Sequence, residues 1–143
     1  MNTHGDAPYA AALAESLDLV AARCADPAPQ VYARLFATRP DLEPLFIRDR
    51  SGIIRGQMLQ VTIETLLDLA NSGDTGTGHY ATGLLQTERV NHQGLGVPTD
   101  AFDSFYTVLR ETLRDIAGND WTPAMDDAWT HAIAAALVAA RDE

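Results

Sequence analysis

His92 is the residue whose type and position most directly indicate chemistry. It lies near the end of a short predicted helix, from about Thr82 to Gln93, and just before Gly94, which suits a left-handed helix stop. A neutral imidazole at this place can bind a metal ion or a haem iron if its ring faces inward. On spacing alone, a lone histidine on a helix is more often a surface or hydrogen-bonded residue. Both interpretations stay open on this pattern.

The elements that would position His92 are helices. Apolar residues recur at helical spacing along nearly the whole chain, and no segment shows the sustained alternation of a half-buried strand, so the sequence predicts an all-α domain. Pro40 and Pro44, four residues apart, predict a short turn of helix at a corner. Besides 82–93, helices are expected before the Asp26–Pro29 turn, over about 29–38, over about 52–71, from Pro98 to about Gly118, and from Thr122, its N-cap, onward.

The helix over 52–71 has one polar and one apolar side. The polar side, predicted to face solvent, carries Gln57, Gln60, Glu64, Asp68 and Asn71. The apolar side, predicted to face the core, carries Met58, Leu59, Thr62, Ile63, Leu66 and Ala70. The unequal lengths of the predicted helices do not fit a four-helix up-down bundle.

Composition places the chain among globular proteins. Its 143 residues suit a single domain, 1–143, in which Met1–Ala7 is expected to be disordered. With 20 acidic and 10 basic residues, the formal charge of -10 argues against nucleic acid or an anionic membrane as partner. A single cysteine, Cys24, suits a reducing compartment, and no run approaches the roughly 20 apolar residues of a membrane span. We therefore expect a cytoplasmic protein.

Three segments carry a resemblance to a known family. The run from Val31 to Phe46 contains Val-Tyr, Leu-Phe, Pro-Asp and Pro-Leu-Phe, where the family has Phe-Tyr, Leu-Phe, Pro-Glu and Pro-Leu-Phe. His92, Val97 and Phe102 follow at intervals of five, and Asp-Ala-Trp stands at 127–129. Over about residues 16–140 the chain resembles single-domain bacterial haemoglobins and the globin domain of flavohaemoglobins.

This resemblance implies a globin fold, six to seven helices around a pocket for haem b. His92 would be the proximal iron ligand, Phe46 the aromatic wedge at the corner and Tyr32 the distal hydroxyl. The proximal packing residues would be Val97, Phe102 and Phe105. The implied function is reversible binding of oxygen or another diatomic ligand such as NO or CO. The alternative for Phe46, Phe102 and Phe105 is an ordinary apolar core, and for Phe102 and Phe105 this alternative is nearly as well supported as haem contact.

The resemblance leaves the distal residue on the 52–71 helix open. Gln57 is attractive because the family often has Gln beside the distal Tyr, yet its position on the polar side directs it to solvent. Ile54, Met58 and Leu59 compete for the same role. We favour Met58 as the pocket residue.

Two alternative functions stay open beside gas binding, and departures from the family pattern bear on both. Glu88, one turn before His92, and the glycine-rich stretch 72–78 motivate a globin-fold sensor or interaction module without haem. An NO dioxygenase or another haem redox enzyme is the second alternative, although Ile133 stands four residues after Trp129, where no carboxylate supports the proximal histidine. Because the chain contains no reductase domain, such an enzyme would need a separate reductase. A monomer or a homodimer is expected.

Overall fold

The computed structural model describes residues 6–72 and 100–141 and contains only helices in these two ranges. The α-helices are α1 (Asp6–Arg23), α2 (Ala28–Thr38), α3 (Ile53–Ser72), α5 (Ala101–Ala117) and α6 (Pro123–Arg141), and the short 3-10 helices are η1 (Pro40–Phe46) and η3 (Gly118–Asp120). The predicted all-α class is confirmed. The helix expected over 82–93 lies outside the described residues.

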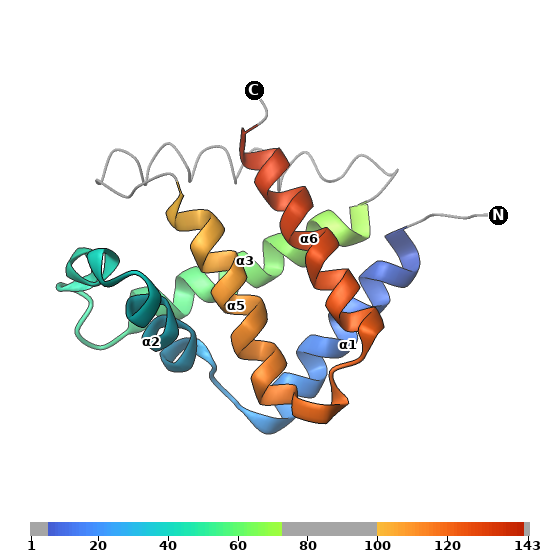
Figure 1. Cartoon of the computed structure of the whole chain (residues 1–143), viewed down its shortest axis with the longest axis horizontal. Helices are drawn as coiled ribbons and strands as arrows, with labels where there is room; N and C mark the ends of the chain where they lie inside the picture. The colour runs from blue at the N-terminus through green and yellow to red at the C-terminus, as the bar shows by residue number, and fades with distance from the viewer. Residues whose placement is uncertain (1–5, 73–99, 142–143) are drawn as a thin grey trace.

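The helices pack as two crossing layers (Figure 1). α5 and α6 are joined through η3 at the lower edge of the view and pass in front of α3. α1 contacts α3, α5 and α6, and α2 packs against α5 and η1. η1 therefore forms one lateral edge of the molecule, beside the beginning of α3.

Local sequence signals set the helix ends. α2 ends at Thr38 and η1 contains both Pro40 and Pro44, so the proline-broken corner forms as predicted. The Met125 N–H donates to Thr122 Oγ1 over 3.1 Å, which confirms Thr122 as the cap of α6. The expected disorder of Met1–Ala7 needs one correction, because α1 already begins at Asp6. The remaining residues 1–5 lie outside the described part.

A buried hydrogen bond connects α1 with α6 in the core. The Trp129 Nε1–H donates to Ser16 Oγ over 2.8 Å, and the Ser16 hydroxyl donates to the Leu13 carbonyl over 2.6 Å. All three side chains are fully buried. Because an indole nitrogen can only donate, Ser16 supplies the acceptor that makes burial of Trp129 possible.

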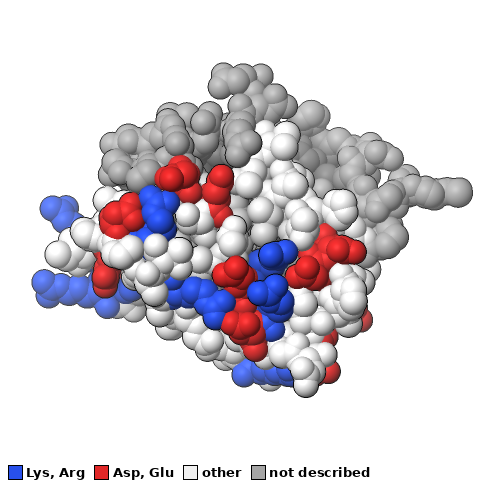
Figure 2. Space-filling view, in the orientation of Figure 1, with Lys and Arg blue, Asp and Glu red and all other residues white. Residues whose placement is uncertain are grey.

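Ion pairs join neighbouring elements at the surface. Arg34 pairs with Asp115 between α2 and α5, Arg23 pairs with Asp120 in η3, and Arg110 lies 3.7 Å from Asp126 between α5 and α6. Acidic and basic side chains accordingly stand beside one another in Figure 2. Each such exposed pair contributes at most about 1 kcal/mol. None of the helices in the described ranges is long and apolar enough to cross a membrane.

We expect Ser16→Ala to lower the free energy of unfolding by about 1 to 3 kcal/mol, because it leaves the buried Trp129 N–H without an acceptor. Urea unfolding followed by tryptophan fluorescence measures this change. Thr107→Ala, at an exposed position of α5, is the control and should change stability by less than about 0.5 kcal/mol. Equal effects of the two substitutions would contradict a structural role for the Ser16–Trp129 bond.

Candidate functional site

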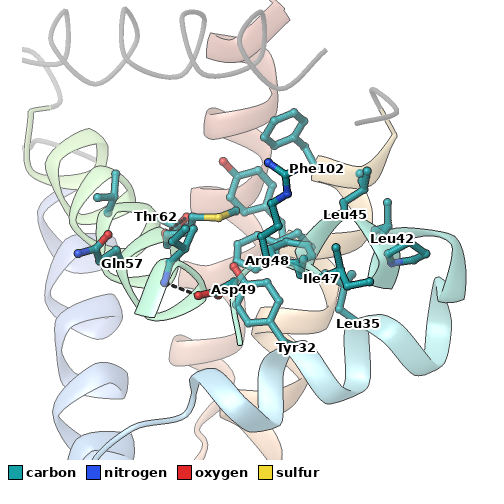
Figure 3. Close-up of a pocket in the computed structure, with 18 of the residues that line it drawn as sticks. Tyr32, Leu35, Leu42, Leu45, Ile47, Arg48, Asp49, Gln57, Thr62 and Phe102 are labelled. Atoms are coloured by element: carbon teal, nitrogen blue, oxygen red, sulfur yellow. Dashed lines mark hydrogen bonds between the residues drawn. The ribbon is translucent and has the colours of Figure 1, made fainter. Parts of the chain in front are cut away.

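A cavity of about 720 Å³ lies between α2, η1, the first half of α3 and the beginning of α5. Figure 3 shows Tyr32 and Leu35 projecting from α2, with Ile47, Arg48 and Asp49 nearby and Phe102 contributed from α5. The wall is mainly apolar and includes Leu35, Leu42, Leu45, Phe46, Ile54, Met58, Val61, Phe102 and Phe105. Volume and lining fall within the usual range of sites for small molecules and cofactors.

Tyr32 contributes a buried phenol to this wall. Its side chain is 2% exposed, and its ring centroid lies 5.4 Å from that of Phe46 and 5.6 Å from that of Phe105. The hydroxyl has no hydrogen-bond partner among the described residues. Burial raises the pKa of Tyr32 well above its ordinary value; the charge of Arg55 lowers it in part and that of Asp49 raises it. The phenol is therefore protonated at every ordinary pH, and its O–H can donate a hydrogen bond.

Tyr106 adds a second phenol, one that the sequence analysis did not assign to a site. It lies on the cavity wall, and its ring centroid is 6.1 Å from that of Phe105. Burial raises the pKa of Tyr106 to about 12, so this group too is protonated at neutral pH. Its place four residues after Phe102 was the available signal, because residues at this spacing share one helix face.

Asp49 and Arg55 fix the beginning of α3 at the cavity. The Asp49 carboxylate is 6% exposed and accepts the backbone N–H of Ile54 over 3.0 Å and that of Arg55 over 2.9 Å. Arg55 Nε lies 3.0 Å from the same carboxylate, and its guanidinium also donates to the Asp49 carbonyl over 2.7 Å. Desolvation acts to raise the pKa of Asp49, but these donors together outweigh it and hold the pKa below its usual value.

The sequence analysis missed this pair, although one signal was present. An acidic residue followed by Ser51 and Gly52 directly before an apolar helix is typical of a helix N-terminus. Gly52 has φ of 80°, a left-handed conformation that lets the chain turn back so that the Asp49 carboxylate reaches the first turn of α3.

The four candidate distal residues of α3 differ in whether they line the cavity, lie in the core or face solvent. Met58 and Ile54 lie on the cavity wall, while Leu59 is buried in the core and is not part of the wall. Gln57 reaches the cavity at its margin and is an exposed residue, in keeping with its place on the polar side of α3 (Figure 3). Its amide is therefore not enclosed beside Tyr32.

Of the residues assigned to the pocket from the sequence, the described part brings six to one cavity: Tyr32, Phe46, Gln57, Met58, Phe102 and Phe105. Two more, His92 and Val97, lie outside the described residues, as does Glu88, the departure from the family pattern one turn before His92. Groups of three or more His, Cys, Asp or Glu side chains that could hold a metal ion do not occur within 6–72 and 100–141.

Comparison with known families decides the class of the protein. A family model described as Globin matches residues 29–140. The chain is a globin. The matched span contains every wall element of the cavity and also His92. Globins typically pack their helices around a haem held by a proximal histidine. No curated protein matches the chain of this globin.

The cavity of this globin suits a haem in three respects. It is large enough for a cofactor, its wall is apolar and aromatic, and a buried phenol without a partner stands on that wall. An unpaired buried donor is unusual in folded proteins and is explained if an occupant accepts its hydrogen bond.

We expect Asp49→Asn to destabilise the protein at neutral pH, because the amide has no charge to offer to Arg55 and the first turn of α3. The lowered pKa sets the pH dependence. The carboxylate stabilises the fold fully above about pH 3.9, the usual value for Asp, and this contribution is lost as the pH falls through the lower folded-state pKa.

Urea unfolding of both proteins from pH 7 to pH 3 tests this dependence on Asp49. The stability difference should be constant above about pH 4 and shrink below it. Glu43→Gln, at an exposed carboxylate of η1, is the control and should change stability little at any pH. A difference for Asp49→Asn that is equally large at pH 3 and pH 7 would contradict the proposed role of the charge.

Proposed function

We propose that this globin binds haem b in the cavity between α2, η1, α3 and α5, with His92 as the proximal ligand, and that it reversibly binds oxygen or another diatomic gas. The observation that carries the proposal is the buried Tyr32 hydroxyl, which has no partner in the described part of the chain and stands on the wall of an apolar cavity of about 720 Å³. Membership of the globin family supports the same cofactor. The more specific likeness to bacterial haemoglobins is part of the proposal.

The haem, when bound, supplies an iron with one open position for the gas. The chain's own residues perform the remaining tasks. Phe46, Phe102 and Phe105 provide apolar and aromatic surface that excludes water from the cavity. Tyr32 holds a phenolic proton that can be donated to the bound gas, and such a bond stabilises an acceptor that carries partial negative charge. Because burial raises the pKa of Tyr32, this donor persists through the physiological pH range.

Reconstitution of the purified chain with haem tests the cofactor and its ligand. We expect a Soret band for the wild type and loss or strong alteration of that band for His92→Ala, because the imidazole would no longer hold the iron. His131→Ala, at an exposed position of α6, is the matched control and should leave the band unchanged. A wild type without a Soret band after reconstitution would instead favour the sensor or interaction module without haem.

Substitution of the phenol tests how the gas is held. Tyr32→Phe should accelerate oxygen dissociation about ten- to a hundredfold, since a hydrogen bond of roughly 1.5 to 3 kcal/mol is lost. Stopped-flow measurement of the dissociation rate gives this factor. Tyr9→Phe, in α1 and away from the cavity, should leave the rate unchanged. If Tyr32→Phe also leaves it unchanged, Tyr32 is not the distal donor.

The same preparations separate an oxygen carrier from an NO dioxygenase. With a reductase present, nitrate formation from NO should not exceed the rate of an inert oxygen carrier. Faster formation would move the assignment to the enzyme.

A further inference from the structure

Exposed apolar side chains gather beside the cavity. Within 6–72 and 100–141, every exposed large apolar residue except Val138 belongs to the segment from 45 to 61, namely Leu45, Ile47, Ile53, Ile54 and Val61. Ile47 is 75% exposed and Ile53 is 63% exposed. Single exposed apolar residues are ordinary, but several in one short segment mark an interaction site. Four of them, Leu45, Ile47, Ile54 and Val61, also line the cavity, so this apolar segment forms its rim, and Ile53 lies outside the lining.

Two arginines in the same segment have no carboxylate partner among the described residues. Arg48 and Arg50 are exposed and make no ion pair in the described part of the chain. Most other described arginines do pair with carboxylates: Arg23, Arg34, Arg39, Arg55 and Arg110. In Figure 2, basic side chains project from the left edge of the molecule, where Figure 1 shows η1 and the segment leading to α3. On a protein of charge -10, Arg48 and Arg50 place two positive charges at this edge, beside the carboxylates of η1.

We propose that Ile47, Arg48, Arg50, Ile53 and Ile54, here called the corner surface, dock an acidic electron-carrier protein. The proposal rests on the proposed function, because ferric haem must gain one electron before it binds oxygen. That electron passes from the reduced carrier to the ferric iron, which leaves the carrier oxidised and moves no proton or covalent bond. The cavity rim is where a docked carrier comes close to the haem.

Composition and charge favour a protein as the occupant. Protein interfaces combine apolar residues at the centre with arginine, and complementary charge fixes the orientation of the partner. A small acidic protein can present one patch to the corner surface alone. An anionic membrane extends past it and would also meet exposed carboxylates of η1, including Asp41 and Glu43, so it would be repelled.

Binding of a plant-type ferredoxin, an acidic one-electron carrier, tests the corner surface. We expect the haem-reconstituted wild type to bind it, more weakly as salt rises. Arg48→Glu or Arg50→Glu should raise Kd roughly tenfold at low ionic strength and flatten the salt dependence. Arg114→Glu is the control, because it changes the formal charge equally but lies in the last turn of α5, and its Kd should stay near that of the wild type.

The apolar part has its own pair of variants. Ile53→Ser should weaken ferredoxin binding, whereas Val138→Ser, at a position of similar exposure on α6, should not. Anaerobic stopped-flow reduction by reduced ferredoxin should follow the same order. Reduction by dithionite should be equally fast in Ile53→Ser and Val138→Ser, since neither residue lines the cavity and dithionite does not need the docking surface.

Three results would overturn the proposal: no ferredoxin binding by the wild type, equal losses for Arg48→Glu and Arg114→Glu, or arginine-dependent binding to phosphatidylglycerol vesicles but not to ferredoxin. Failure of the haem assignment is separately visible as a missing Soret band. In that case, binding of ferredoxin to the haem-free chain still reports on the corner surface, and its dependence on Arg48 would support the surface without the haem.

Discussion

An apolar cavity remains open only where the contacts behind its walls are stronger than the tendency of apolar surfaces to close on one another. In this globin those contacts lie on both sides of the cavity. The rings of Tyr32, Phe46 and Phe105 brace α2, η1 and α5 against one another. Further away, the Ser16–Trp129 bond fixes α1 to α6 in the core. Close packing of these elements keeps helix positions fixed, so the side chains on the wall cannot move inward to fill the space.

The polar groups at the cavity differ in whether the protein itself supplies their hydrogen-bond partners. Asp49 and Arg55 satisfy each other and the first turn of α3, and this closed set of hydrogen bonds determines where α3 starts. The charges of Arg55 and Asp49 both act on the pKa of Tyr32, yet the Tyr32 hydroxyl has no hydrogen-bond partner among the described residues. The site therefore combines a rigid, fully bonded support with one unbonded donor, which is the division expected between groups that position a ligand and groups that contact it.

The fold was predictable because helical periodicity and proline signals act locally. Pro40 and Pro44 interrupt helical hydrogen bonding without help from other elements, and the Thr122 hydroxyl caps the helix that directly follows it. Tyr32, Phe46 and Met58 were found through family resemblance and the apolar side of α3. Asp49 and Tyr106 were not, because their roles depend on contacts between elements that no local pattern encodes. Gln57 was a distal candidate through family resemblance, but its place on the polar side of α3 predicted that it is exposed.

The unpaired hydroxyl of Tyr32 has a consequence for the amount of folded protein. A buried donor without an acceptor costs about 1 to 3 kcal/mol, so the chain with nothing to accept that proton is less stable than it would be with a phenylalanine there. Whatever fills the cavity and accepts the bond removes this cost and shifts the folding equilibrium by mass action. Chains that lack an occupant would therefore unfold more often than occupied ones, and the folded fraction of the globin would follow the supply of what it binds.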